Sequence, residues 1–357
     1  MEYNVIGLMS GTSLDGLDLV NCLIKETQAK WGYEILHTKS IPYDIAFQKT
    51  LKDAIHLPAI NLLQFHHEYG RWLGKQIKEF TKENNIKANL VASHGHTIHH
   101  QPQNGFTFQL GYGQDIANIS GLKTVADFRS ADIASGGQGA PLVPIGDELF
   151  FGAYDFCLNL GGISNISYKK DGERYAYDIG LANMVLNHII QKTGKAYDEN
   201  GSLAASGTVN NQLLDKLNKL QYYQEKPPKS TGYEWFLEEV IPIVSGTTDS
   251  TKNMLCTAVH HICNAVSNDI KELSEKPKNS VLITGGGAFN NFLIQTLKQQ
   301  LGPDFQVDTS NTQLIEFKEA LVFGLMGVLR INNLPNCLSS VTGATSDVTG
   351  GVIFNPN

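Results

Sequence analysis

The sequence lacks any hydrophobic run long enough to cross a membrane and any segment typical of a secretory leader. The longest apolar stretch, Ala320–Leu329, is far shorter than the roughly 20 residues that a membrane helix requires. The opening residues, MEYNVIGLMSG, contain neither a basic start nor a long apolar run, so no signal peptide is predicted. We therefore expect a cytoplasmic protein without a membrane partner.

Cysteine is also scarce, with 5 residues in 357 and therefore an odd number. Most of them lie in apolar segments, and none belongs to a paired metal-binding motif. We expect buried free thiols in a reducing compartment rather than disulfides or metal ligands. The five are Cys22, Cys157, Cys256, Cys263 and Cys337.

The common nucleotide-binding motifs and an excess of positive charge are missing as well. Gly194-Lys195 is followed by Ala196, so there is no G-x-x-x-x-G-K-[ST] loop, and no G-x-G-x-x-G follows the first apolar run. The formal net charge of −7 disfavours nucleic acid as a partner. An anionic ligand would need backbone N–H groups, a metal ion or a few placed cations.

What the sequence does contain indicates a two-domain α/β protein. A length of 357 residues exceeds what one core usually serves, and 41% hydrophobic with 18% charged residues is ordinary for a globular chain. Each half opens with an apolar run, a Gly/Ser-rich turn and a second run. The Gly/Pro-rich stretch 135–144 predicts a boundary. We expect one domain over 1–133 plus 337–357 and another over 134–336.

Three glycine-rich turns, each directly after an apolar run, are candidates for binding a nucleotide: Gly11–Gly16, Gly161–Asn165 and Gly285–Asn291. Glycine lets the backbone approach phosphate oxygens, and successive N–H groups can surround an anion. Two such turns could hold the β- and γ-phosphates, and the third, which opens a helix, could hold the adenosine. A single short glycine-rich turn taken alone favours an ordinary hairpin tip over a phosphate site.

Several polar side chains are candidates for chemistry, each with a structural alternative. Asp178 is expected to follow the end of a strand and to precede a helix, where a carboxylate can act as a base, bind a metal or cap the helix. The histidines at 94, 96, 99 and 100 favour substrate contact or core packing over metal binding. Arg129 can pair with a ligand carboxylate or form a surface salt bridge. Glu316 and Glu319 can stabilise the start of the last helix.

Taken together, the motifs resemble those of the anhydro-N-acetylmuramic acid kinases, in the superfamily of sugar kinases, heat-shock protein 70 and actin. The resemblance runs along the whole chain. It rests on these segments: GLMSGTSLDGLD, SHGHTIHHQP, ADFRSADIASGGQGAPLVP, LNLGGISNIS, YDxG…N, YDENGSLAASG, PPKSTGYEWF, TGGGAFNNFL, EALVFG and VTGAT.

The resemblance implies two ribonuclease-H-like α/β domains of the actin-like ATPase fold, with ATP, Mg²⁺ and substrate between them. It implies a kinase that opens 1,6-anhydro-N-acetylmuramic acid with water and phosphorylates its 6-oxygen during peptidoglycan recycling. Asp178 matches the catalytic base. Arg129 and Glu319 match residues near the sugar, and we expect Ser93 and His94 there too. The implied protein is a cytoplasmic homodimer with a small-molecule amino sugar as its partner.

The resemblance also assigns nucleotide-binding residues. The first turn matches the ATP-phosphate loop, and Asp15 and Asp18 within it are expected to hold Mg²⁺ through ATP. The expected ATP-binding residues are Gly11, Thr12, Ser13, Leu14, Asp15, Gly16, Leu17 and Asp18 of the first turn, Gly161 and Gly162 of the second, and Gly285, Gly286, Gly287 and Asn290 of the third.

The chain departs from the family pattern after Asp178. The usual T-G-P-G-N is Ile179-Gly180-Leu181-Ala182-Asn183, a later aspartate is Asn187, and His96 stands where glutamine is usual. We expect this to remove a hydroxyl next to the base and to reshape the turn. Two alternatives to the expected kinase are a kinase of the same fold for another amino sugar and a catalytically silent sensor of nucleotide and muropeptide.

Overall fold

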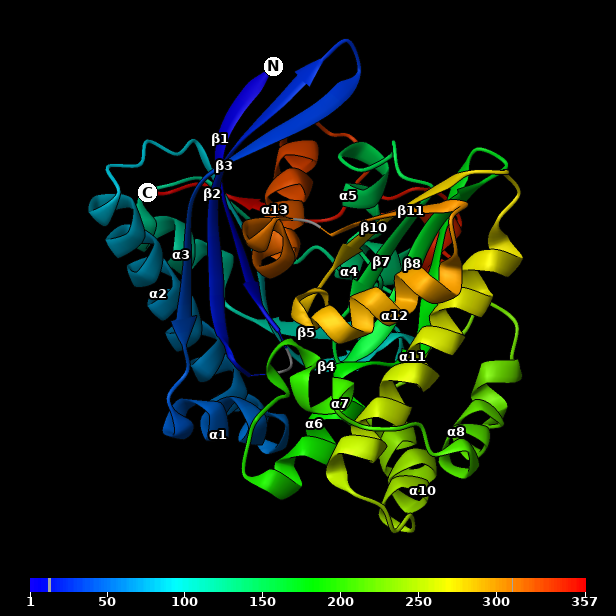
Figure 1. The fold of residues 1–357 in the computed structure, drawn as a ribbon. Helices are drawn as coiled ribbons and strands as arrows, with labels where there is room; N and C mark the ends of the chain where they lie inside the picture. Colours follow the sequence, from blue (N-terminus) through cyan, green and yellow to red (C-terminus); the bar gives the residue numbers. More distant parts are fainter. Residues whose placement is uncertain (12–13, 310) are drawn as a thin grey trace. The chain divides into compact units, whose positions relative to one another are not determined.

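The computed structural model describes residues 1–11, 14–309 and 311–357. The chain divides into two compact units, each with its own sheet (Figure 1). Unit 1 comprises Met1–Gly152 and Phe317–Asn357, and unit 2 comprises Ala153–Glu316. The division falls inside one helix, α13 (Thr312–Ile331).

Unit 1 contains a seven-stranded sheet of order β12-β6-β4-β1-β2-β3, with β5 attached to β4. Its strands are β1 (Glu2–Ser10), β2 (Gly16–Thr27), β3 (Lys30–Pro42), β4 (Leu90–Gln101), β5 (Phe106–Leu110), β6 (Thr124–Ala126) and β12 (Val352–Phe354). Its helices are α1 (Ile45–Asp53), α2 (Ala59–Glu83), α3 (Gly113–Ser120), α4 (Ser130–Ala134), α5 (Pro144–Leu149), the later part of α13, and α14 (Ser339–Thr342). Short 3₁₀ turns are η1 (Ala54–His56) and η2 (Pro102–Asn104).

Unit 2 contains a five-stranded sheet of order β11-β10-β7-β8-β9. Its strands are β7 (Phe156–Leu160), β8 (Ile163–Lys170), β9 (Glu173–Leu181), β10 (Asn279–Thr284) and β11 (Phe305–Thr309). Its α-helices are α6 (Asn183–Ile190), α7 (Ser202–Ala205), α8 (Asn211–Asn218), α9 (Tyr233–Trp235), α10 (Ile241–Ser245), α11 (Thr251–Leu273) and α12 (Asn291–Leu301). The 3₁₀ turns are η3 (Gln191–Thr193), η4 (Glu199–Gly201), η5 (Gln221–Gln224) and η7 (Gly286–Phe289), and η6 (Phe236–Val240) is a short π-helix.

The two sheets share one topology. In unit 1, β1, β2 and β3 form an antiparallel meander, and β4 and β6 follow parallel to β1. In unit 2, β7, β8 and β9 form the meander, and β10 and β11 run parallel to β7. This strand order is the ribonuclease-H-like arrangement, so the predicted α/β fold with two such domains is confirmed. The predicted hairpin that opens each half is confirmed as well.

The sheet of unit 1 is covered on both faces. On one face α2 and α3 contribute an apolar core that includes Tyr69, Leu73 and Ile116 (Figure 1). On the other face α13 packs against the strands so closely that a Cβ at Gly7 of β1 would overlap the carbonyl oxygen of Ala320. Glycine at position 7 therefore allows the helix backbone to lie on the strand.

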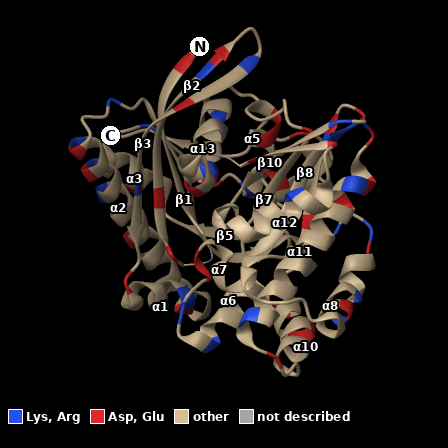
Figure 2. Cartoon of the chain, viewed as in Figure 1, with Lys and Arg blue, Asp and Glu red and all other residues tan. Residues whose placement is uncertain are grey.

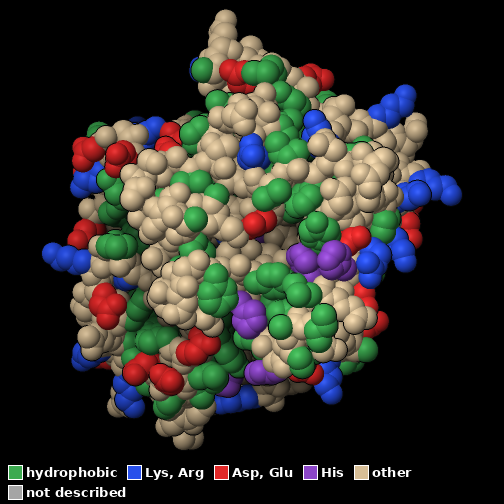
Figure 3. Space-filling model, turned by 180° about the vertical axis from the view of Figure 1, so that it is seen from behind, with side chains coloured by type: hydrophobic (Ala, Val, Ile, Leu, Met, Phe, Trp, Pro, Cys, Tyr) green, Lys and Arg blue, Asp and Glu red, His purple; other side chains and the backbone are tan. Residues whose placement is uncertain are grey.

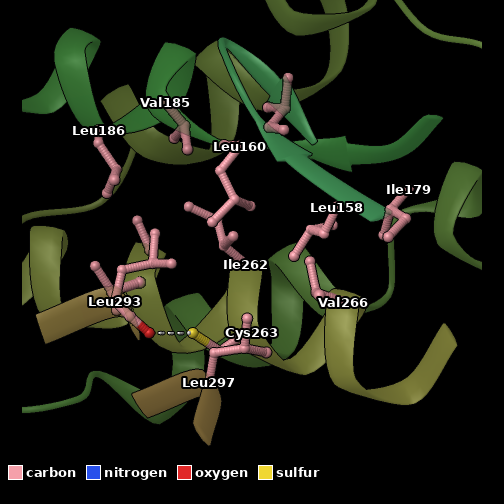
Figure 4. Packing of buried hydrophobic residues seen from close by; sticks show 14 of the residues in the cluster. Leu158, Leu160, Ile179, Val185, Leu186, Ile262, Cys263, Val266, Leu293 and Leu297 are labelled. Atoms are coloured by element: carbon pink, nitrogen blue, oxygen red, sulfur yellow. Dashed lines mark hydrogen bonds between the residues drawn. The ribbon is translucent and has the colours of Figure 1, made fainter. Parts of the chain in front are cut away.

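The core of unit 2 lies between its sheet and the helices α6, α11 and α12. Figure 4 shows side chains from all four sources turned toward one another, among them Leu158 of β7, Val185 of α6, Val266 of α11 and Leu297 of α12. The thiol of Cys263 also lies in this core, 3.5 Å from the carbonyl oxygen of Leu293. The apolar spacing of Thr251–Leu273 thus produces a largely buried helix.

The structure divides the chain at other positions than the sequence suggests, because residues 134–152 and 317–336 belong to unit 1. Lys318 and Asp147 form a buried ion pair at 2.6 Å. A Cβ at Gly146 would overlap Val322 of α13. Breaking a buried pair is costly, so these contacts tie α5 and α13 into one unit.

The charged, hydrophobic and cysteine side chains are distributed as the composition suggests. Acidic and basic residues are interspersed along α2 (Figure 2), and hydrophobic side chains form separate patches among charged and other residues on the face in Figure 3. The five cysteines are free and buried. Burial raises the pKa of Cys22 and Cys337 to about 12. Among the described residues, no helix is long and apolar enough to cross a membrane.

Close packing of β1 on α13 predicts a large difference between two glycine substitutions in the same sheet. Gly7→Ala should lower the free energy of unfolding by more than about 3 kcal/mol, because backbone atoms must move apart. Gly32→Ala in β3 meets no atom within 4 Å and should change stability by less than about 1 kcal/mol. Urea unfolding of both variants measures the difference, and equal stabilities would contradict the packing.

Candidate active site

The turn between β1 and β2 carries the first predicted phosphate-binding residues. Thr12 and Ser13 lie outside the described residues. Leu14 has a left-handed φ of 62°, and its N–H donates to the carbonyl of Gly11 at 3.3 Å. A Cβ at Gly16 would overlap the carbonyl oxygen of Ile41 in β3. Glycine at position 16 is therefore required by strand packing, whether or not it also approaches a ligand.

The residues that follow this turn differ in their surroundings. Leu17 is 1% exposed and its side chain belongs to the core of unit 1. Asp15 is exposed, whereas Asp18 is half-buried and its Oδ1 accepts a hydrogen bond from the Ser40 hydroxyl at 2.5 Å. Of these predicted residues, the two carboxylates thus have a chemistry suited to a cation, and Leu17 offers only its backbone.

A chain of buried hydroxyl groups holds the end of β1 where this turn begins. The Tyr43 hydroxyl donates to Ser10 Oγ at 2.7 Å, and the Tyr69 hydroxyl lies 2.8 Å from that of Tyr43. Ser10 Oγ in turn lies 3.0 Å from Nδ1 of His96. Because Tyr43 gives its proton to Ser10, Tyr69 must donate to Tyr43, and Ser10 is free to donate to His96. Burial lowers the pKa of His96 to about 4, so this ring is a neutral acceptor.

Arg129, which precedes α4, is anchored by His94. Its Nε and Nη2 contact Nε2 of His94 at 3.0 and 2.8 Å, and Nη1 donates to the carbonyl of Gly139 at 2.5 Å. The Nδ1 of His94 lies 3.0 Å from the carbonyl of Gly95, which places the ring proton on Nδ1 and leaves Nε2 as the acceptor. Both nitrogens of His94 are thus engaged within the protein, and N–H groups on Nη1 and Nη2 of Arg129 remain for a ligand.

Burial and neighbouring charges leave His94 neutral and Arg129 positively charged. Burial, together with the charge of Arg129, holds the pKa of His94 well below its usual value, so the ring is neutral. Burial lowers the pKa of Arg129 to about 10, while the charge of Glu319 opposes that shift, so the guanidinium stays positive at neutral pH. Limited hydration of its carboxyl raises the pKa of Glu319, against the charge of Arg129.

The structure therefore brings Ser93, His94, Arg129 and Glu319 into one region of unit 1. Ser93 is buried and its Oγ accepts the N–H of Gly95 at 3.3 Å. Gly95 has a left-handed φ of 75°, which breaks the strand alternation that would have put His94 and His96 on one face. No group of three or more His, Cys, Asp or Glu able to hold a metal occurs in the described part of the chain.

Asp178 lies inside β9 of unit 2 rather than after a strand, because the strand continues to Leu181. Its carboxylate oxygen Oδ2 accepts the hydroxyl of Ser230 at 2.8 Å and the N–H of Thr231 at 3.2 Å. Desolvation raises the pKa of Asp178, and these two hydrogen bonds lower it. One oxygen is thus held in place while Oδ1 makes neither of these contacts.

The loop around Ser230 contacts Asp178, although none of the site residues expected from the sequence lies in this loop. The N–H of Asp178 donates to the carbonyl of Lys229 at 3.2 Å, and the Tyr222 hydroxyl donates to the Asp178 carbonyl at 2.6 Å. The ammonium of Lys229 lies 4.8 Å from the centre of the Tyr222 ring. The signal available in the sequence was the hydroxyl pair Ser230-Thr231 after two prolines.

The second and third glycine turns lie close together in unit 2. The carbonyls of Gly161 and Gly162 accept the N–H groups of residues 182–184 at the start of α6. Gly285 has a left-handed φ of 79°, and a Cβ there would lie 2.5 Å from Asn159 Oδ1. A Cβ at Gly287 would lie 2.6 Å from Leu160 Cβ. These glycines let the two turns pack against each other.

A cavity of about 440 Å³ opens beside the third turn. Its volume is in the range of small-molecule sites. Gly286 and Asn290, both predicted, line it together with Tyr197, Asn200 and Phe289. Asn290 also caps α12 through the N–H of Leu293 at 3.0 Å. The segment 197–200 is therefore part of the cavity wall.

The residues that depart from the family pattern have different environments. Ile179 and Leu181 are buried in the core of unit 2 (Figure 4 shows Ile179). Ile179 lies where the register between β8 and β9 shifts, and its side chain packs into the core, whereas the carboxylate of Asp178 contacts Ser230 and Thr231. A threonine at this position would not place its hydroxyl beside that carboxylate, contrary to the expectation. Asn187, by contrast, lines the cavity.

Comparison with known proteins gives a consistent result. A sequence model described as anhydro-N-acetylmuramic acid kinase matches residues 3–356. The chain is 37% identical to the protein of that name from Nitrosomonas europaea, over 98% of this chain and 99% of the relative. It is 34% identical to that from Vibrio cholerae, over 99% and 98%. A solved structure of the activator of 2-hydroxyisocaproyl-CoA dehydratase from Clostridium difficile, with bound ADPNP, has a TM-score of 0.46 at 11% identity, over 92% of this chain and 96% of that one.

The buried position of residue 179 predicts how two nearly isosteric substitutions differ. Ile179→Val should reduce the free energy of unfolding by about 0.5–1.5 kcal/mol through lost packing. Ile179→Thr should reduce the free energy of unfolding by about 1–3 kcal/mol more than Ile179→Val does, because the threonine hydroxyl is moved from water into an apolar core. Denaturant unfolding of the two variants measures this difference. Equal stability would mean that the side chain at 179 does not face the core.

Proposed function

The chain belongs to the anhydro-N-acetylmuramic acid kinase family, and from this premise we propose that it opens 1,6-anhydro-N-acetylmuramic acid with water and phosphorylates the freed 6-oxygen. The product would be N-acetylmuramic acid 6-phosphate. The relatives named above are kinases for the anhydro sugar by name, and the chain is a kinase of that family. The opening of the ring, the product and the place in cell-wall recycling are the proposal.

The observation that carries the proposal is the carboxylate of Asp178. A general base must be ionised, and it must present an oxygen that can accept a proton from water. Ser230 and Thr231 hold Oδ2, and no hydrogen bond described for residues 1–11, 14–309 and 311–357 uses Oδ1, so Oδ1 can accept the proton of that water. Partial burial raises the pKa of this group, which makes it a stronger base than an exposed carboxylate.

The proposed reaction is balanced without an additional reagent. Water attacks C1 of the sugar as Asp178 accepts its proton, and the bond between C1 and O6 breaks. O6 then forms a bond to the γ-phosphorus of ATP, and ADP leaves. Strain in the bicyclic acetal favours ring opening, and capture of O6 prevents it from closing again.

Residues of unit 1 have the chemistry to bind the part of the sugar that carries the lactyl group. Muramic acid carries a lactyl carboxylate, and an arginine fork matches a carboxylate in geometry and charge. Arg129 has N–H groups beyond those used by His94 and Gly139. We propose that Arg129 binds the lactyl group, with Glu319 and Ser93 near the ring. His94 supports Arg129 from behind.

ATP is a substrate in this proposal, and Mg²⁺ would bind together with its phosphates. Mg²⁺ is commonly held by one or two carboxylates together with phosphate oxygens, and Asp15 and Asp18 on either side of Gly16 form such a donor set. When bound, the ion would spread the charge of the transferring phosphoryl group. The glycine turns at 11–16, 161–162 and 285–287 would hold ATP, with the adenosine in the cavity beside Asn290.

A cytoplasmic, homodimeric enzyme completes the proposal. Five free, buried cysteines suit a reducing compartment. A kinase for a different amino sugar is the second candidate, raised by the departures from the family pattern after Asp178. Asn187 lines the cavity proposed for the adenosine, so it bears on the nucleotide rather than on the sugar. Ile179 and Leu181 give it no support, because their side chains lie in the core.

Replacement of the proposed base tests the function. Asp178→Asn keeps the shape but removes the proton acceptor, and it should lower the rate of phosphate transfer to the anhydro sugar by about 10²–10⁴-fold. ADP release measures the rate, and mass spectrometry in ¹⁸O-labelled water checks that solvent oxygen enters at C1. Asp155→Asn is the control, because Asp155 forms a surface ion pair with Lys276.

Absence of turnover by the wild type on the anhydro sugar would sink the proposal. Turnover of another amino sugar in a panel of free and anhydro sugars would favour the second candidate. Tight binding of nucleotide and sugar without turnover, unchanged in Asp178→Asn, would indicate a sensor.

The Ser230 hydroxyl predicts a shift in the pH dependence. It stabilises the ionised form of Asp178, so its removal in Ser230→Ala should raise the pKa of Asp178. The base then becomes protonated at a higher pH, and the acidic limb of the kcat/KM profile should move to higher pH. On the plateau, loss of one hydrogen bond should cost about tenfold or less. Ser230→Thr keeps a hydroxyl and should restore the wild-type limb. If the acidic limb does not move in Ser230→Ala, the Ser230 hydroxyl does not control the pKa of the catalytic base.

A further inference from the structure

The strand that carries Asp178 contains one residue more than its partner strand, directly beside the proposed base. In the pairing of β9 with β8, Asp178 lies opposite Asn165 and Gly180 lies opposite Ser164, so Ile179 is an extra residue in β9. This is a β-bulge, an irregularity that changes the direction of neighbouring side chains and is over-represented next to active sites. The bulge therefore sets the direction in which Asp178 leaves the strand.

The bulge turns two backbone N–H groups toward the outer edge of the sheet. β9 is the last strand in the sheet order, and N–H groups along an antiparallel strand point alternately toward the partner and away from it. The N–H of Ala182 donates to the carbonyl of Gly162 in the loop before β8, so that of Leu181 points outward. The N–H of Asp178 also points outward, to Lys229. Regular alternation would turn groups three residues apart to opposite edges, and the extra residue brings both to one edge.

Two adjacent tyrosines of η5 cover this edge on either side of the bulge. The Tyr222 hydroxyl donates to the carbonyl of Asp178 at 2.6 Å, and the Tyr223 hydroxyl accepts the N–H of Leu181 at 3.3 Å. Both bonds form together when Asp178 and Leu181 face the same edge. The pair thus favours the bulged form of β9 over a regular strand, in which one of the two residues would face β8.

Tyr223 also packs on the bulge itself. A Cβ at Gly180 would lie 2.3 Å from Cε1 of the Tyr223 ring, so the ring rests directly on the glycine backbone. The same ring meets the imidazole of His261 at 88°, with ring centres 4.7 Å apart. Burial lowers the pKa of His261 to about 3, so this imidazole is neutral, and its Nδ1 lies 2.6 Å from Oδ1 of Asn218. These contacts fix the ring whose hydroxyl holds Leu181.

The hydrogen bond from Leu181 to Tyr223 accounts for one departure from the family pattern. Leu181 stands where that pattern has proline, and proline has no N–H. Leu181 is 2% exposed, and a buried N–H without a partner is costly, so leucine at this position requires an acceptor that proline would not. The Tyr223 hydroxyl is that acceptor.

We propose that Tyr223 is a positioning residue for the proposed base. Its hydroxyl holds the bulge of β9 through Leu181, and the bulge holds the carboxylate of Asp178 where Ser230 and Thr231 bind Oδ2. The proposal rests on the function proposed above, because it takes Asp178 as the base. A displacement of about 1 Å at a reacting group can lower a rate by about 10²-fold, even when the altered residue is distant.

Removal of the Tyr223 hydroxyl tests the proposal. Tyr223→Phe keeps the ring but leaves the N–H of Leu181 without its acceptor. It should lower kcat for phosphate transfer to anhydro-N-acetylmuramic acid by about tenfold and leave the KM values for sugar and ATP within about twofold, because the geometry of the base changes rather than the binding of substrates. A kcat within about twofold of the wild type, or a loss carried by KM alone, overturns the proposal.

A matched control lies in the same strand. Tyr175 also belongs to β9, but its hydroxyl donates to the Glu173 side chain at 3.1 Å, away from the bulge. Tyr175→Phe makes the same chemical change and should leave kcat within about twofold of the wild type. Melting temperatures of both variants check that they are folded. An equal loss of kcat in Tyr175→Phe and Tyr223→Phe overturns the proposal.

A second substitution separates the hydrogen bond from other effects of the tyrosine. Leu181→Pro removes the N–H that Tyr223 accepts, so in this background Tyr223→Phe should change kcat by less than about twofold. The same tenfold loss in both backgrounds would show that the Tyr223 hydroxyl does not act through Leu181, and it would overturn the proposal.

Amide hydrogen exchange tests the positioning without requiring turnover. In Tyr223→Phe the N–H of Leu181 should exchange at least about tenfold faster. The N–H of Thr231 should also exchange faster, because it donates to the carboxylate of Asp178 from another segment. The N–H of Ala182, which donates to a carbonyl beside β8, is the reference and should not change. Faster exchange confined to Leu181, or none, overturns the proposal.

The outcome is separable from failure of the kinase reaction itself. A wild type that transfers no phosphate to the anhydro sugar contradicts the proposed function. The exchange of the Thr231 N–H in Tyr223→Phe then decides whether Tyr223 positions Asp178. The same measurement decides it if Leu181→Pro does not fold.

Discussion

The cost of taking charge out of water governs how the candidate site is built. Arg129 and Asp178 are both partly buried, and each has specific partners that limit the cost. Arg129 rests on a neutral histidine and a carbonyl rather than on a second charge. It is therefore held in place and keeps its positive charge for a ligand. Asp178 is held by a hydroxyl and an N–H in the same way.

This use of neutral partners distinguishes the site residues from the structural ion pair in unit 1. Lys318 and Asp147 bind each other at 2.6 Å in a buried setting, and their charges are mutually compensated. Such a pair fastens α5 to α13 but contributes little field of its own. The neighbouring Glu319 and Arg129 are arranged differently, each with charge left for a ligand. Unit 1 thus contains one ion pair that joins two helices and, beside it, charged groups that can interact with a ligand.

The sequence was sufficient for features that depend on neighbouring residues. Both opening hairpins, the long helix at 251–273 and the glycine turns follow from local spacing and turn chemistry. Contacts between distant segments could not be obtained in this way. Arg129 and His94 are 35 residues apart, and Ser230 and Asp178 are 52 apart. The strand end at Asp178 was misplaced because burial of Ile179 and Leu181 extends β9, and burial is a tertiary property.

Buried cysteines in each unit can report how often that unit opens. A thiol reacts with an alkylating reagent as the thiolate and only when the reagent can reach it. Burial suppresses both conditions at Cys22 and Cys337 in unit 1 and at Cys263 in unit 2. Labelling at these positions then proceeds at the rate at which the surrounding unit opens, in the manner of hydrogen exchange. Mass-spectrometric timing of alkylation, with and without nucleotide or sugar, would report which unit each ligand stabilises.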